Sequence, residues 1–102
     1  MLVLLSLIGQ LADPMPAIGL TLEVGQEFEI ALPCRGEEMW TSHDFDRKVA
    51  RQERLPTISA WRQSCPFVAR GPGKTTIRLI CGRGSEPRVR IVEVSIEVKE
   101  KP

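Results

Sequence analysis

The chain contains no tyrosine, no asparagine and only one histidine. Without asparagine there is no acceptor for N-glycosylation. Two Trp and three Phe are its only large aromatic side chains, too few for the rows of stacked rings that bind single-stranded nucleic acid. A formal net charge of +1 provides no global field toward nucleic acid or an anionic membrane. We therefore expect no nucleic acid binding.

Long hydrophobic runs are also missing. The longest apolar stretch, residues 2–8, is too short to span a bilayer, so stable membrane insertion is not expected. It resembles the apolar part of a secretory signal peptide but lacks the basic residues that precede one. Two interpretations remain open: a signal remnant in a secreted or periplasmic protein, or a first strand. We assign residues 1–19 to this segment and residues 20–102 to one domain with one core.

The residue sets that enzymes and metal sites need are incomplete. The three cysteines show no CxxC spacing, so no zinc site is predicted. His43 lies near Asp44 and Asp46, but on a charged segment that is typical of a solvated face. The sequence GPGKTT at residues 71–76 has Val68 where a phosphate-binding loop needs its first glycine. We predict no enzyme, no metal and no cofactor.

Strict alternation of apolar and polar residues dominates what is present. It predicts strands near residues 20–24, 27–32, 77–81 and 92–98, each burying one face. Residues 57–63 read as an edge strand, or as a strand entering a loop.

Between these strands the pattern changes. Trp40 is expected to begin a strand and to lie in the core, whereas residues 41–54 are charged and predict a loop or short helix. Ile91 and Val92 are adjacent apolar residues, and a β-bulge there would reconcile the two phases. The fold class predicted is all-β: an immunoglobulin-like antiparallel β sandwich of about seven strands, with a small barrel as the alternative.

The cysteines follow the same periodicity. Cys34 continues the inward phase of its strand, and Cys81 does the same at the end of another. The two could face each other across a sandwich and form a disulfide, or they could be separate buried thiols. Cys65 is then the odd thiol and is expected to be buried.

Three stretches resemble, in order, the chagasin family of papain-like cysteine protease inhibitors. Residues 22–33 (LEVGQEFEIALP) resemble the family's opening segment, Trp40 follows the first inhibitory loop, and residues 65–79 (CPFVARGPGKTTIRL) resemble a later framework run. The similarity covers residues 20–99. It implies an immunoglobulin-like fold with three inhibitory loops at one end.

The counterparts of those loops depart from the family's motifs. The first, residues 34–39, lacks the family's Asn, Thr and Tyr, and Gly36 is its one correspondence. The second, residues 59–64, has no glycine, and the third, residues 82–87, keeps Arg83 but lacks the Trp. The resemblance implies these partner-binding residues: Arg35, Gly36, Glu37, Met39, Trp61, Arg62, Arg83, Gly84 and Glu86.

Two hypotheses for function follow. In the first, the chain is a non-enzymatic binding domain that inhibits papain-like cysteine proteases by placing its loops in the active-site cleft. In the second, it is a secreted or periplasmic immunoglobulin-like module with a structural or adhesive role and no protease target.

Overall fold

The structure, a computed structural model, describes residues 2–7, 18–34, 39–59, 61–81 and 90–101. The described residues form nine strands and no helix, so they include no helix that could cross a membrane. The strands are β1 (Leu2–Ser6), β2 (Ile18–Glu23), β3 (Glu27–Pro33), β4 (Trp40–His43), β5 (Ala50–Gln52), β6 (Thr57–Ser59), β7 (Arg62–Ala69), β8 (Gly73–Cys81) and β9 (Arg90–Lys99). The predicted all-β class is confirmed.

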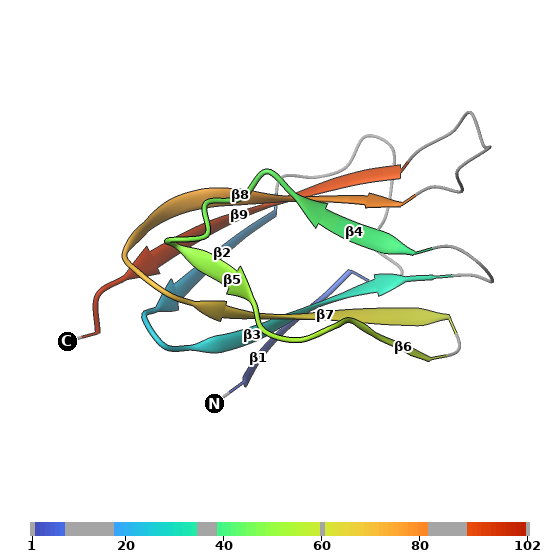
Figure 1. Ribbon diagram of the computed structural model, residues 1–102, viewed down its shortest axis with the longest axis horizontal. Helices are drawn as coiled ribbons and strands as arrows, with labels where there is room; N and C mark the ends of the chain where they lie inside the picture. Colours follow the sequence, from blue (N-terminus) through green and yellow to red (C-terminus); the bar gives the residue numbers. More distant parts are fainter. Residues whose placement is uncertain (1, 8–17, 35–38, 60, 82–89, 102) are drawn as a thin grey trace.

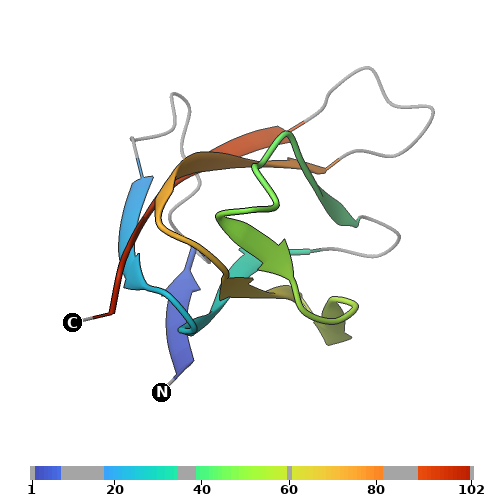
Figure 2. The same cartoon turned by 60° about the vertical axis from the view of Figure 1, so that its left-hand side comes forward.

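The strands form two sheets packed face to face (Figure 1). Sheet A has the order β1-β3-β7-β5, and β6 also pairs with β7; sheet B has the order β2-β9-β8-β4. Figure 2 shows the two sheets as separate layers with the edge strands β1 and β2 on the same side. This is the sandwich architecture, in which the inner faces of both sheets supply the core.

Two of the pairings differ from the expected antiparallel arrangement. β1 pairs with β3 in parallel, and β2 pairs with β9 in parallel. β2 comes between β1 and β3 in sequence but lies in the other sheet, so the chain returns to sheet A running in its original direction. The boundary expected between residues 19 and 20 lies inside β2, and Leu2–Ser6 is a strand of sheet A.

Alternate residues of the long strands fill the space between the sheets. In β9, Val92, Val94, Ile96 and Val98 are buried. The rings of Phe28 and Phe67 stack with centroids 5.4 Å apart, and the Phe45 ring meets Phe67 edge-on at 5.8 Å. Burial of this kind contributes about 25 cal/mol per Å² of apolar surface, so the alternation seen in the sequence is the main determinant of the fold.

The structure answers three expectations, for residues 41–54, for residues 57–63 and for residue 91. Residues 41–54 contain no helix and include most of β4, a turn and β5. For residues 57–63 the structure favours the second alternative, a strand entering a loop, because β6 ends at Ser59 and β7 begins at Arg62 in antiparallel pairing. The pairing of β8 with β9 runs without interruption from Gly73 to Cys81, so there is no bulge near residue 91.

Candidate partner-binding site

The strand ends that flank the predicted loops meet at one end of the sandwich. Pro33, the last residue of β3, pairs with Arg62, the first of β7. Trp40, the first residue of β4, pairs with Cys81, the last of β8, and Cys81 pairs with Arg90, the first of β9. Figure 1 shows these strand ends together on the right-hand side of the molecule. We call this region the loop end.

Trp40 joins the two sheets at the loop end. Its side chain is 1% exposed, as expected for a core residue. The indole Nε1 donates a hydrogen bond of 2.7 Å to the carbonyl oxygen of Pro33 in sheet A, although Trp40 itself belongs to sheet B. The Arg90 guanidinium lies over the indole ring, 5.2 Å from its centroid, within the range of a cation–π interaction.

Gln63 makes a second polar connection between the sheets, which the sequence reasoning missed. Its side chain is fully buried. Its Oε1 accepts a 2.8 Å hydrogen bond from the Trp40 backbone N–H, and its Nε2 donates to the Trp40 carbonyl oxygen at 2.7 Å. A buried amide needs such partners. The signal was the phase of β7, since Gln63 shares the inward parity of Cys65 and Phe67.

Trp61 is the most exposed aromatic side chain among the described residues, at 68%. It lies in the turn between β6 and β7 with a φ of +69°, a left-handed conformation that is uncommon for residues other than glycine. Its carbonyl oxygen accepts a 3.0 Å hydrogen bond from the Cys34 backbone N–H. The turn is thereby tied to the end of β3, and its indole is presented to solvent on a fixed backbone.

The structure describes two other predicted contact residues, Met39 and Arg62, which lie directly after or before the tryptophans of the loop end: Arg62 follows Trp61, and Met39 precedes Trp40. Met39, directly before the buried Trp40, is 50% exposed. Arg62 begins β7 and is partly exposed. Of the predicted second loop, Ser59 ends β6 and residues 62–64 belong to β7, so among the described residues Trp61 is the one that lies in the turn.

The structure decides between the two alternatives for Cys34 and Cys81 in favour of separate thiols without a disulfide. All three cysteines are buried thiols. Trp40 stands between the two strand ends concerned: its backbone pairs with Cys81, and its indole reaches Pro33, the residue before Cys34. Cys81 also accepts a 3.7 Å contact from the Arg90 guanidinium at its Sγ.

Cys65 is buried, as expected, and its environment predicts a pH dependence of stability. Burial raises the pKa of the Cys65 thiol to about 11, while a hydrogen bond from Gln63 acts in the opposite direction. The unperturbed thiol has a pKa of 9.0, so the folded state holds its proton over a wider pH range than the unfolded chain does. We expect this contribution to the free energy of unfolding to be complete below about pH 9 and to be lost by about pH 11, at up to about 1.4 kcal/mol per pH unit.

Urea unfolding at pH 8 to 11 measures this effect, with Cys65→Ala as the control. The lysines titrate in both proteins, so the difference between their slopes of unfolding free energy against pH reports the thiol. Parallel pH profiles for the two proteins would contradict the prediction.

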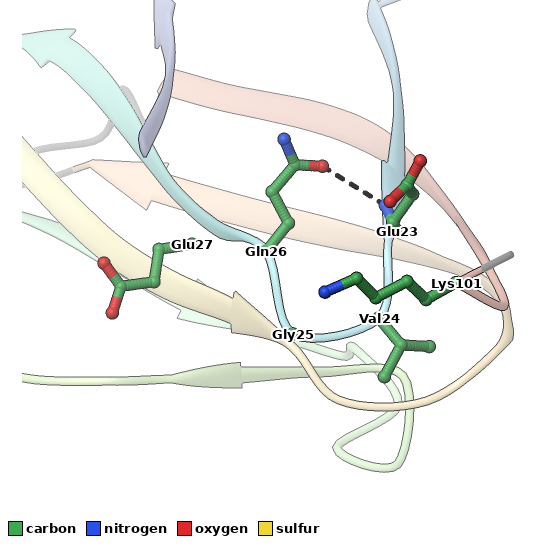
Figure 3. A pocket seen from close by; sticks show the side chains of 6 residues that line it. All are labelled: Glu23, Val24, Gly25, Gln26, Glu27 and Lys101. Carbon is green, nitrogen blue, oxygen red and sulfur yellow. Dashed lines mark hydrogen bonds between the residues drawn. The ribbon is translucent and has the colours of Figure 1, made fainter. Parts of the chain in front are cut away.

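The opposite end of the molecule offers a polar hollow instead. It has a volume of about 510 Å³ and is lined by residues 23–27 and Lys101 (Figure 3). Gly25 forms the turn there with a φ of +90°, and the Gln26 side chain accepts a hydrogen bond from the Glu23 backbone N–H. Figure 3 shows the Glu23 and Glu27 carboxylates pointing away from each other. The hollow therefore holds no paired carboxylates and offers a ligand few apolar contacts.

The residues considered as metal ligands have other partners. The His43 ring lies 2.7 Å from the Thr41 hydroxyl, Asp44 pairs with Arg78 at 3.6 Å, and Asp46 accepts from the Lys48 backbone N–H. Among the described residues, no group of three His, Cys, Asp or Glu side chains is arranged to hold a metal ion.

No protein-family model and no curated protein matches the sequence. Solved structures match its fold. The crystal structure of the cysteine protease inhibitor EhICP2 from Entamoeba histolytica has a TM-score of 0.75 at 16% identity, over 96% of this chain and 95% of that one. The solution structure of amebosin has a TM-score of 0.64 at 14% identity, over 95% of this chain and 97% of amebosin. The chain has the chagasin-like fold. Domains 4 and 5 of the S-layer protein SbsC are also similar, with a TM-score of 0.61 at 14% identity, over 80% of this chain and 47% of that one.

In the chagasin-like fold seen here, the three predicted contact segments all begin or end at the loop end. Six of the predicted contact residues lie outside the described residues: Arg35, Gly36, Glu37, Arg83, Gly84 and Glu86. The described part of the site is the base formed by Trp40 and Gln63, together with the exposed side chains of Met39 and Trp61 and the partly exposed Arg62.

Proposed function

We propose that the chain is a non-enzymatic binding domain that inhibits papain-like cysteine proteases by occluding the active-site cleft with its loop end. The observation that carries this proposal is the exposed Trp61 in a left-handed turn. Backbone strain at a non-glycine residue persists only where the surroundings impose it, and it clusters at functional sites. The shared fold with a cysteine protease inhibitor supports the same function.

The loop end has the physical properties that such an inhibitor needs. Exposed Trp and Arg side chains provide much of the binding energy at protein interfaces. The turn that carries Trp61 is held by the backbone of Cys34, and the hydrogen bonds of Gln63 fix the start of β4. A site held rigid before binding loses less conformational entropy when the complex forms. Inhibition of this kind is steric and requires no covalent bond.

The proposal is tested by titrating the protein into a papain-like cysteine protease and a serine protease, each with a fluorogenic peptide substrate. We expect loss of activity of the cysteine protease alone, with the inhibitor recovered uncleaved. A dissociation constant of about 10 μM is weaker than that of most specific protein complexes. If neither enzyme is inhibited at this concentration, the proposal is overturned. That result would favour a structural or adhesive module instead, a role that the likeness to an S-layer protein supports.

A further inference from the structure

The outer face of sheet B is polar along most of β8 and β9. The side chains on this face are Lys74, Thr76, Arg78, Glu93, Ser95 and Glu97. Two isoleucines interrupt the pattern at the loop end. Ile80 and Ile91 lie directly opposite each other in the ladder, and Ile91 is 41% exposed. Because the pairing of β8 and β9 has no bulge, the position of Ile91 in the strand places it on this face.

Met39 extends this apolar feature across the edge of the sheet. Thr41 pairs with Ile80, and its hydroxyl donates to the Ile80 carbonyl oxygen at 3.4 Å. Met39 lies two residues before Thr41, and both are exposed on either side of the buried Trp40. Side chains two residues away from a cross-strand partner lie about 7–8 Å from it, within reach of a long side chain. We call Met39, Ile80 and Ile91 the outer strip.

A single exposed isoleucine is ordinary on a protein surface. The outer strip differs because three apolar side chains gather where the strand ends meet, and because charged groups border them. The next pair of the ladder on this outer face is Arg78 and Glu93, and Arg78 lies 3.6 Å from Asp44 and 4.0 Å from Glu93. An apolar centre with a polar rim is the usual composition of a protein interface.

We infer that the outer strip is a second contact surface for the same protease, and that it binds an uncharged, apolar surface beside the active-site cleft. This inference rests on the function proposed above. Trp61 belongs to the sheet A side of the loop end and the outer strip to the sheet B side, with Trp40 packed between the sheets. The strip is continuous with the loop end through Met39. The protease would therefore be contacted both from the sheet A side of the loop end, by Trp61, and from the sheet B side, by the outer strip.

The test compares Ile91→Lys with Ser95→Lys in the inhibition assay. Both substitutions place a lysine on the outer face of β9, but Ser95 lies away from the loop end. We expect the inhibition constant of Ile91→Lys to rise at least about 10-fold, because a charge would be buried against an apolar surface. Ser95→Lys should stay within about 2-fold of wild type, since changes to surface residues outside an interface have small effects.

Circular dichroism melting of both variants shows whether the fold is intact, and Ile91→Thr replaces Ile91→Lys if the lysine variant does not fold. If the wild-type protein inhibits, Trp61→Ala weakens inhibition and the Ile91 variant matches wild type, the outer strip is wrong and the proposed function stands. If the wild-type protein does not inhibit at all, both are wrong.

Discussion

Trp40→Ala is expected to lower the free energy of unfolding by about 3–5 kcal/mol, the usual cost of removing a buried Trp or Phe side chain. The substitution removes a fully buried indole, its hydrogen bond to the Pro33 carbonyl oxygen and its contact with the Arg90 guanidinium. A domain of this size has a total stability of about 5–15 kcal/mol. We therefore expect the variant to be largely unfolded at moderate urea concentrations where the wild type is folded.

Trp40→Phe separates packing from hydrogen bonding. It keeps an aromatic ring in the core but leaves the Pro33 carbonyl oxygen without its 2.7 Å donor. The loss of one such bond is worth about 1 kcal/mol, so this variant should lie between wild type and Trp40→Ala. Urea unfolding followed by circular dichroism measures all three proteins. A loss below about 1 kcal/mol for Trp40→Ala would show that Trp40 does not hold the sheets together.

Trp61→Ala is expected to raise the inhibition constant about 30-fold or more, which corresponds to the 2 kcal/mol or more of an interface hot spot. Trp61 is 68% exposed, so its removal takes little apolar surface out of the core. The melting temperature should therefore change little. Inhibition kinetics and thermal melting of the same preparation test both parts, and unchanged inhibition would remove Trp61 from the site.

Trp61→Gly is the matched variant, because it relieves backbone strain, which favours folding, while it removes the indole, which weakens inhibition. The φ of +69° at this position strains any residue with a Cβ, whereas glycine adopts it without cost. Relief of this strain is worth about 1 kcal/mol or more, so the glycine variant should be at least as stable as Trp61→Ala and inhibit as poorly. A glycine variant that inhibits like wild type would mean that the turn, and not the indole, contacts the partner.

The strands with strict alternation could be predicted from the sequence. Every second residue is buried from Phe28 to Leu32, from Ile77 to Cys81 and from Val92 to Val98, with Ala31 buried as well. A strand with one apolar face can satisfy it only against the core. The burial of Val92 followed from the same periodicity, whereas Trp40 was expected in the core as a large aromatic residue and Cys65 as the thiol left over. The parallel pairings of β1 and β2 did not, since alternation shows which face of a strand is buried and not which strand lies beside it.

The errors at the loop end have a common cause: alternation along one strand says nothing about contacts between strands or about the backbone conformation of a turn. The alternation of apolar and polar residues correctly placed the Cys34 and Cys81 side chains inward. It could not show that Trp40 lies between the two strand ends that carry them. Ile91 was assigned to a bulge because an outward isoleucine breaks the pattern, whereas the ladder continues without one. The resemblance implied a loop at residues 59–64, but alternation alone did not show the β6–β7 turn, because turns with a positive φ are expected at glycine or asparagine and here the residue is Trp61.

The measurement that tests the central claim most directly is the inhibition of a papain-like cysteine protease at several substrate concentrations. Occlusion of the cleft predicts competitive inhibition by one inhibitor molecule per enzyme: the apparent KM rises with inhibitor concentration while kcat stays constant. A fall in kcat at constant KM would place the partner site outside the cleft. No inhibition at about 10 μM would contradict the protease-inhibitor function itself.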